Sequence, residues 1–247
     1  MKIIAFNGSP HGQSGNTDKI LQPFLAGAHE AGAETETVYL TDKKINHCIG
    51  CLSCWLKTPG ICVHQDDMPE LLEKIRKANL VIYATPLYVY TVSGLMKDFM
   101  DRILPIIKPH IIKRGNQYIH PTRYEEEWPK KMVLISSCGY PERHHFAALV
   151  KTFRQFSASA PDLTLTATIL CAAAGVLSIP GYEEAVQCYL DAAHRAGQEV
   201  VKQGCVTPDT QKVLDHNLID PETYSSGANA YFDSIINCQT NQGDASN

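Results

Sequence analysis

The stretch KIIAFNGSPHGQSGNT, residues 2–17, indicates the fold class, because an apolar run leads directly into a loop of small polar residues. The run Lys2–Phe6 is typical of a buried strand, and it ends at Asn7. A helix is predicted from about residue 16 to residue 31, with Gly32 where a C-terminal glycine is expected. This strand, loop and helix form the first unit of an α/β fold.

Strand and helix patterns then alternate along the chain. Further strands are predicted at Glu36–Leu40, Asn79–Ala84, Met132–Ser136 and Leu163–Leu170. Helices are predicted to end near Lys77 and to span Val92–Leu104, Arg143–Phe156 and Glu183–Lys202. Asp66 or Asp67 is the expected N-cap of the first of these helices. Five alternations favour a parallel sheet with helices on both faces, which binds ligands at the carboxyl ends of its strands.

Composition and charge exclude several classes of protein. The chain has 247 residues, 44% of them hydrophobic, and a net charge of −4, which fits a globular protein with a sizeable core. The acidic balance argues against nucleic-acid binding, and no stretch is apolar enough to span a membrane. Nine cysteines without a signal sequence at the N-terminus indicate a reducing, cytoplasmic location.

The loop after the first strand suits a phosphate group. It precedes a helix N-terminus, where free backbone N–H groups and the helix dipole favour an anion. It lacks the GK[ST] of a nucleotide-triphosphate loop and the GxGxxG of a dinucleotide fold. Hydroxyls and amides remain, with His11 as the only cation, so a monophosphate held by hydrogen bonds is one interpretation and an ordinary capped turn is the other.

A family resemblance appears at this point. The sequences Gly8-Ser9-Pro10-His11 and Ser14-Gly15-Asn16-Thr17, together with ATPLYVYTVSGLMKDFMDR (84–102), resemble the NADPH-dependent FMN reductase group of flavodoxin-like proteins over roughly residues 1–200. The resemblance implies a flavodoxin-like, doubly wound, five-stranded parallel sheet, with FMN as cofactor and NAD(P)H as a co-substrate. It places the FMN phosphate at Ser9, His11, Ser14, Gly15, Asn16 and Thr17. It places the isoalloxazine ring at Pro86, Leu87, Tyr88, Val89 and Tyr90.

The loop after the fourth strand, SSCGY (136–140), lies at the same edge of the sheet. Cys138 and Gly139 are therefore candidates for contacts with the polar edge of the flavin. A nucleophilic Cys138 with His144 or His145 as base is the alternative, although the glycines of a nucleophile elbow are absent. Plain packing of Cys138 is a third possibility. Lys97 and Asp101 are predicted to form a structural surface pair on a helix.

Four cysteines are clustered as C-x2-C-x2-C-x7-C, at Cys48, Cys51, Cys54 and Cys62. Three thiolates at such spacing can wrap a compact iron–sulfur cubane, whereas zinc ribbons usually show two CxxC pairs further apart. Zinc or free thiols are the alternatives. The stretch resembles the cysteine motif of the iron–sulfur flavoproteins, a branch of the same family. That resemblance implies a [4Fe–4S] cluster close to the flavin of a neighbouring subunit, a homodimer or homotetramer, and reduced ferredoxin as a donor.

The expected organisation is an FMN-binding domain at 1–204, with a cysteine loop at 43–68 and an insertion without clear period at 108–130. Residues 205–247 are expected to form an arm, frayed over the last nine residues. Aromatic residues in the insertion and the arm suggest an oligomer contact, a lid over the flavin, or local packing; they are Tyr118, Tyr124, Trp128, Tyr224, Tyr231 and Phe232.

The favoured function is an oxidoreductase that passes electrons through FMN and a [4Fe–4S] cluster, with no catalytic side chain assigned. The alternatives are a cluster-free NAD(P)H-dependent flavin or quinone reductase, a non-catalytic electron carrier or redox sensor, and a Cys138-dependent hydrolase.

Overall fold

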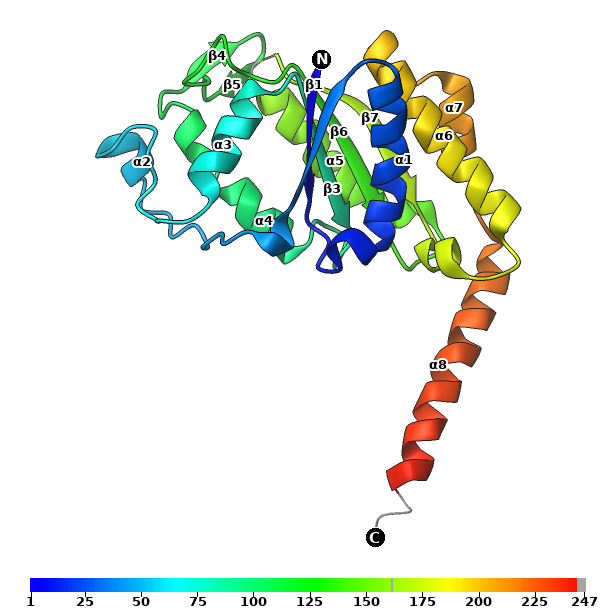
Figure 1. Cartoon of the computed structure of the whole chain (residues 1–247). Coiled ribbons are helices and arrows are strands. Elements are labelled where there is room, and N and C mark those ends of the chain that lie inside the picture. Colours follow the sequence, from blue (N-terminus) through cyan, green and yellow to red (C-terminus); the bar gives the residue numbers. More distant parts are fainter. Residues whose placement is uncertain (161, 244–247) are drawn as a thin grey trace.

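A five-stranded parallel sheet forms the centre of the computed structural model, which describes residues 1–160 and 162–243 (Figure 1). The strand order is β2-β1-β3-β6-β7. The strands are β1 (Lys2–Asn7), β2 (Glu34–Tyr39), β3 (Leu80–Pro86), β6 (Lys131–Ser137) and β7 (Thr164–Cys171). This order confirms the predicted flavodoxin-like, doubly wound sheet.

Helices cover both faces of the sheet (Figure 1). On one face lie α1 (Asn16–Glu30) and α6 (Glu183–Lys202), and on the other lie α3 (Met68–Lys77), α4 (Gly94–Asp101) and α5 (Ala147–Ser159). Successive residues of β1 alternate between the two cores, so that Ile3 packs under α1 and α6 while Ile4 packs under α3. The buried, apolar strands therefore read as continuous hydrophobic runs.

Two glycines allow α1 and α6 to approach closely. A Cβ on Gly27 would lie 1.9 Å from the His194 carbonyl oxygen, and one on Gly197 would lie 2.0 Å from the Phe24 carbonyl oxygen. Backbone therefore meets backbone at this crossing, and any side chain at either position would force the helices apart.

Several predicted boundaries are wrong, for local reasons. The helix predicted at Val92–Leu104 is α4, which starts only after Ser93, because the Ser93 hydroxyl accepts a hydrogen bond from the Met96 amide and caps it. The helix predicted at Arg143–Phe156 begins as the 3-10 turn η4 (Arg143–Phe146), and α5 follows. Neither Asn16 nor Thr17 caps α1, whose N-cap position is Gly15.

The insertion at 108–130 contains a small antiparallel hairpin of β4 (Ile112–Arg114) and β5 (Gln117–Ile119). Short, exposed strands of three residues leave little hydrophobic period in the sequence, which is why the pattern shows none. The cysteine loop contains one helical turn, α2 (Ser53–Leu56). Its Trp55 indole donates a hydrogen bond to the Leu104 carbonyl oxygen at 2.9 Å, which fastens α2 to η3 (Leu104–Ile106).

The C-terminal arm is helical. The helix α7 (Pro208–Leu214) packs on α6 and β7, whereas α8 (Pro221–Gly243) projects away from the sheet and its helices (Figure 1). The sequence predicts fraying over residues 239–247; the backbone of α8 is described as far as Gly243, and residues 244–247 lie outside the described part of the chain. Over residues 1–160 and 162–243, no helix combines the length and apolarity needed to cross a membrane.

Candidate functional site

The loop between β1 and α1 is organised by Asn7, which is fully buried at the end of β1. Its side-chain amide donates to Asp18 Oδ1 at 3.0 Å, and its Oδ1 accepts from the Ser9 backbone amide at 2.9 Å. The Ser9 hydroxyl in turn accepts from the His11 amide at 3.3 Å. The end of the strand and the start of the helix are thereby tied together, and the loop has a fixed shape.

Gly15 stands where this loop enters α1. A Cβ at this position would lie 2.6 Å from Ser9 Oγ and 3.2 Å from His11 Cβ, so only glycine leaves the Ser9 hydroxyl in place. The first amides of α1 have no carbonyl partner within the helix, and the positive end of its dipole lies here. The loop is thus a preformed cradle for an anion.

The loop after β3 turns sharply at residues 88–91. The Tyr88 amide donates to the Thr91 carbonyl at 3.0 Å, and the Thr91 amide donates back at 3.1 Å. Val89 and Tyr90 both have positive φ, at 47° and 65°, which defines a type I′ turn built without glycine. A β-branched residue in the left-handed region is strained, and such strain is characteristic of ligand-binding segments.

A cavity of about 290 Å³ opens between these loops at the carboxyl ends of the strands. Nine of the thirteen predicted cofactor residues line it: Ser9, His11, Asn16, Thr17, Pro86, Leu87, Tyr88, Cys138 and Gly139. The cavity therefore has hydroxyls and a helix N-terminus on one side and an apolar loop on the other. That combination suits a ligand with a phosphate and a flat apolar ring.

The other four predicted residues do not line the cavity. Ser14 is exposed, and its hydroxyl donates to the His11 carbonyl at 2.8 Å. Gly15 lies against Ser9, as described above. Val89 is 88% exposed, and the Tyr90 ring stacks on Tyr140 with 6.4 Å between centroids. The type I′ turn leaves the Val89 and Tyr90 side chains outside the lining of the cavity.

Four lining residues were missed by the sequence reasoning: Ser137, Ala174, Gly175 and Tyr224. Ser137 immediately precedes Cys138, and its hydroxyl shares a hydrogen bond with Thr17 Oγ1 at 2.9 Å, which joins β6 to α1. Its place in the SSCGY loop was a usable signal. Tyr224 comes from α8, and its hydroxyl oxygen lies 3.2 Å from where a Cβ on Gly175 would stand. Tyr224 is one of the six aromatic residues for which the sequence suggests an oligomer contact, a lid over the flavin or local packing, and it lies in the lining of the cavity.

Cys138 is buried, and its thiol donates to the Tyr140 carbonyl at 3.4 Å. Burial raises the pKa of this thiol, against smaller opposing effects of nearby backbone groups. The Cys138 amide is also used, since it donates to the Cys171 carbonyl at 3.0 Å. A neutral, hydrogen-bonded thiol is a poor nucleophile, so the geometry argues against the hydrolase hypothesis.

The cysteine loop is closed at its base by hydrogen bonds between its two ends. The Asp67 carboxylate accepts from the Lys44 amide at 2.7 Å, and the Asp66 carboxylate accepts from the Asn46 amide at 2.9 Å. The N-cap position of α3 is Asp67, one of the two predicted residues, but its side chain makes no capping hydrogen bond; the Met68 amide donates instead to Asp66 Oδ1 at 3.2 Å. Residues 47–65 thus form a loop whose ends are fixed.

The four clustered cysteines share this loop. Cys54 is buried, Cys62 is partly buried, and Cys48 and Cys51 are exposed. Burial raises the pKa of Cys54, and the nearby Cys62, Cys51 and Cys48 raise it further, so Cys54 lies within electrostatic reach of the other three cysteines. Over residues 1–160 and 162–243, however, no three Cys, His, Asp or Glu side chains converge closely enough to hold a metal ion.

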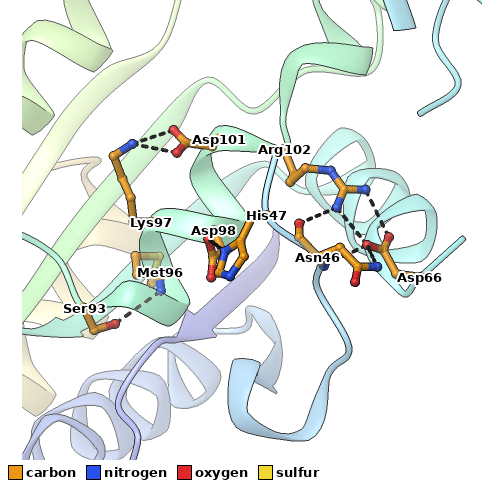
Figure 2. Close-up of polar contacts among 9 residues, drawn as sticks. All are labelled: Asn46, His47, Asp66, Ser93, Met96, Lys97, Asp98, Asp101 and Arg102. Atoms are coloured by element: carbon orange, nitrogen blue, oxygen red, sulfur yellow. Dashed lines mark hydrogen bonds and ion pairs between the residues drawn. The ribbon is translucent and has the colours of Figure 1, made fainter. Parts of the chain in front are cut away.

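Arg102 joins the closed base of the loop to the end of α4 (Figure 2). Its Nη1 donates to Asp66 Oδ2 at 2.7 Å and to the Asn46 carbonyl at 2.6 Å, and its Nη2 donates to Asp66 Oδ1 at 3.1 Å. Both side chains of this ion pair are almost completely buried. Figure 2 also shows the predicted pair of Lys97 and Asp101, which is confirmed at 2.7 Å on the surface of the same helix.

The profile of one protein family, described as NADPH-dependent FMN reductase, matches residues 1–168. The chain belongs to this family. The matched range includes the loop after β1 and the loop after β3, whose sequences are the motifs from which the resemblance was inferred. Membership also identifies the chemistry of the family, which is flavin-dependent oxidation and reduction.

Individual relatives include an iron–sulfur flavoprotein of Archaeoglobus fulgidus, 35% identical over 142 residues, which are 58% of each chain. Another, from Methanocaldococcus jannaschii, is 41% identical over 106 residues, 43% of this chain and 53% of the relative. The matches thus span little more than half the length of these relatives.

Solved structures share the fold at low identity. A NAD(P)H:quinone oxidoreductase from Methanothermobacter marburgensis is 18% identical with a TM-score of 0.58, covering 81% of this chain and 96% of its own. An FMN-dependent NADH-azoreductase from Bacillus anthracis, solved with FMN, is 18% identical with a TM-score of 0.56, covering 82% and 99%.

Proposed function

We propose that the chain is an FMN-dependent oxidoreductase whose flavin occupies the cavity at the carboxyl edge of the sheet. The observation that carries this proposal is the cavity itself, in which a hydroxyl-lined helix N-terminus faces the apolar loop at Pro86–Tyr88. The Gly15 cradle and the buried Asn7 network preorganise the phosphate side. FMN would supply the redox chemistry, and the protein would supply binding, orientation and access.

Different residues of the chain would bind the phosphate and the ring of FMN. Ser9, Asn16 and Thr17 are placed to hold the phosphate together with the first amides of α1. The Cys138 N–H already donates to the Cys171 carbonyl. Of the two residues predicted at the polar edge of the flavin, Gly139 is therefore the one that would offer its backbone N–H to the ligand. Tyr224 covers the cavity from α8 and would limit access of water and of acceptors to the ring.

We further propose that Cys48, Cys51, Cys54 and Cys62 hold a [4Fe–4S] cluster. The chemistry of the donor set supports this, because four thiols are the ligands of such a cluster and all four occupy one loop whose ends are fixed. Loading would require the cysteine side chains to converge, because no three of them do so among the described residues. A cluster exchanges single electrons, so its pairing with FMN suits transfer between NAD(P)H or reduced ferredoxin and a one-electron or two-electron acceptor.

A second candidate is a NAD(P)H-dependent flavin or quinone reductase without a cluster. The observation that favours it is the lack of convergence among the cysteine side chains of the described residues. The two candidates share the flavin site and differ only in what the cysteine loop holds.

We also propose that the protein is a homo-oligomer, dimer or tetramer, assembled through α8. Ala228, Tyr231 and Ile235 follow each other at intervals of three and four residues, which is the spacing of a helix–helix seam. Tyr231 is 62% exposed on a helix that projects from the body (Figure 1). Light scattering after size-exclusion chromatography tests this: Tyr231→Glu is expected to reduce the oligomer, and Ser226→Glu, on the opposite side of the helix, is not.

The deciding experiment for the function is chemical analysis of protein purified without oxygen. Assays of FMN, iron, sulfide and zinc per chain are combined with an absorption spectrum. FMN with about four irons and four sulfides supports the iron–sulfur proposal. FMN without iron, together with oxidation of NADPH in the presence of a quinone, supports the second candidate. Failure to bind FMN even after its addition contradicts both.

A further inference from the structure

A second cavity lies next to the flavin cavity, between α8 and the segment that begins with the 3-10 turn η5 (Ala174–Ser178). Its volume is about 540 Å³, within the range of about 300–1,000 Å³ that is typical of small-molecule sites. Gly175 and Tyr224 line both cavities, so the two spaces have a common wall. Because Gly175 has no side chain, the Tyr224 hydroxyl can approach the backbone of η5 at this wall.

The lining of the second cavity is apolar and aromatic. None of the ten described residues that line it carries a charge, and its aromatic side chains include Tyr182, Tyr231 and Phe232. A phosphate or a carboxylate would lose its hydration here without gaining a counter-charge, whereas aromatic side chains favour contact with flat rings. The second cavity therefore suits an uncharged, flat, apolar molecule.

One face of α8 forms the outer wall of the second cavity. Tyr224, Gly227, Ala228 and Tyr231 follow each other at the intervals of three and four residues that place side chains on one side of a helix. Glycine lowers the stability of a helix relative to alanine, so Gly227 is unfavourable for α8 itself. A Cβ at Gly227 would have no atom within 4 Å, which shows that the glycine borders open space.

The hydroxyl of Tyr224 is a polar group at the common wall. It has no hydrogen-bond partner among the described residues. Burial raises the pKa of Tyr224, so the hydroxyl keeps its proton at neutral pH and remains a donor. By contrast, the hydroxyl of the neighbouring Thr223 already donates to Asp220 Oδ2 at 3.0 Å. A ligand with a carbonyl oxygen would satisfy the free donor of Tyr224.

We propose that the second cavity binds the electron acceptor, a flat, apolar carbonyl compound of the quinone class, and that its carbonyl oxygen accepts a hydrogen bond from the Tyr224 hydroxyl. The inference rests on the proposed function as an FMN-dependent oxidoreductase, and it names the acceptor and its site. The acceptor gains two electrons and two protons from reduced FMN, which leaves a hydroquinone and oxidised FMN.

A second copy of the chain is the other candidate for this surface. Ala228 and Tyr231 line the cavity and also belong to the proposed seam of α8. The common wall with the flavin cavity favours the acceptor, because a seam between helices needs no access to the flavin. The experiment therefore measures both ligand binding and oligomeric state.

The test is the binding of menadione, a naphthoquinone, to oxidised, FMN-loaded full-length protein without an electron donor, so that no turnover occurs. Isothermal titration calorimetry gives the dissociation constant for wild type, Gly227→Leu, Tyr224→Phe and Ser226→Leu. Gly227→Leu adds a side chain to the lining, and Tyr224→Phe removes the hydroxyl while keeping the ring. Ser226→Leu is the matched control, because it adds the same side chain on the opposite side of α8, outside the lining. FMN content and light scattering are measured for every form.

Gly227→Leu is expected to weaken menadione binding by about tenfold, Tyr224→Phe by about fivefold, and Ser226→Leu is expected to leave it unchanged. Equal dissociation constants in all four forms would overturn the inference, and so would FMN-loaded wild type that binds no menadione. A changed oligomeric state of Gly227→Leu without weaker menadione binding would assign the surface to a second copy and would also overturn it. Wild-type protein that takes up no FMN would instead refute the proposed function.

Discussion

The flavin cavity and the cysteine loop are both candidate redox sites, but they are held in different ways. The cavity lies where the parallel sheet places the ends of its strands, and its shape comes from backbone geometry and short hydrogen bonds such as those of Asn7. The cysteine loop lies outside the sheet, between β2 and α3, and its base depends on the ion pair of Arg102 and Asp66.

Because of this difference, we expect the cavity and the cysteine loop to differ in how well they tolerate substitutions. Many small contacts determine the cavity, so that losing one of them weakens binding without removing the site. The loop depends on two buried charges, and removing either one leaves the other uncompensated. The variants below test this contrast.

The largest effect is expected from Asp66→Asn, which leaves the Arg102 charge without its partner. Breaking a buried ion pair in this way costs about 3–5 kcal/mol of the free energy of unfolding. Urea denaturation followed by circular dichroism measures the loss. Asp101→Asn, at the surface ion pair with Lys97, is the control and should cost less than about 1 kcal/mol. Equal losses of unfolding free energy in Asp66→Asn and Asp101→Asn would show that the buried ion pair contributes no more to stability than the surface pair.

The difference in stability between wild type and Asp66→Asn is expected to depend on pH. Burial alone would raise the pKa of Asp66, but hydrogen bonds from Arg102, Asn46 and Met68 hold it well below its ordinary value. A carboxyl with a lowered folded pKa stabilises the protein above its unfolded pKa of about 4, and this contribution is lost as the pH falls further. The stability gap between wild type and Asp66→Asn should thus be constant from pH 7 to about pH 5 and shrink below about pH 4. A gap that stayed constant into strong acid would contradict this assignment.

Gly15→Ala is expected to weaken FMN binding by about tenfold, or about 1.4 kcal/mol. The backbone at Gly15 has φ of −75°, which alanine adopts freely, so the effect is the contact of the new Cβ with Ser9 Oγ. Quenching of flavin fluorescence gives the dissociation constant. Gly94→Ala serves as the control, because nothing lies within 4 Å of its added Cβ. Unchanged affinity in Gly15→Ala would place the phosphate elsewhere.

Thr17→Val removes the hydrogen bond to Ser137 that joins α1 to β6, while keeping the volume of the side chain. A buried hydrogen bond contributes about 1 kcal/mol, so a loss of that size is expected in the free energy of unfolding of the flavin-free protein. Thr152→Val, at an exposed position on α5, should have a smaller effect. Thermal and urea unfolding of both variants make the comparison.

The smallest effect belongs to Lys97→Ala. Its ion pair with Asp101 is formed by two exposed side chains four residues apart on α4, and such pairs contribute about 0.3–0.5 kcal/mol. Unfolding curves at low and high salt should show this difference disappearing as the salt concentration rises. A loss above about 1 kcal/mol would mean that Lys97 has a role beyond the surface pair.

Local sequence patterns predict much of the fold. Apolar runs such as Leu80–Pro86 are buried on both faces of the sheet, so their hydrophobicity alone identifies them as strands. The loop after β1 was readable because its residues are neighbours in sequence and in space. By contrast, the hairpin of β4 and β5 and the helical arm were not predicted, since exposed segments carry weak periodicity.

The order of strands and helices, the polar loop after β1 and the spacing of the four cysteines can be predicted from the sequence, because each of these depends on residues close together in the chain. The fold selects Tyr224 from the aromatic residues suggested as a lid and brings it to the cavity, places Ser137 against Thr17, and buries Arg102 against Asp66. The Arg102–Asp66 and Thr17–Ser137 contacts join residues that are 36 and 120 positions apart in the chain, and the packing of the fold brings these partners together. The burial of a charge is a property of the folded environment, and an arginine in a sequence carries no sign of it.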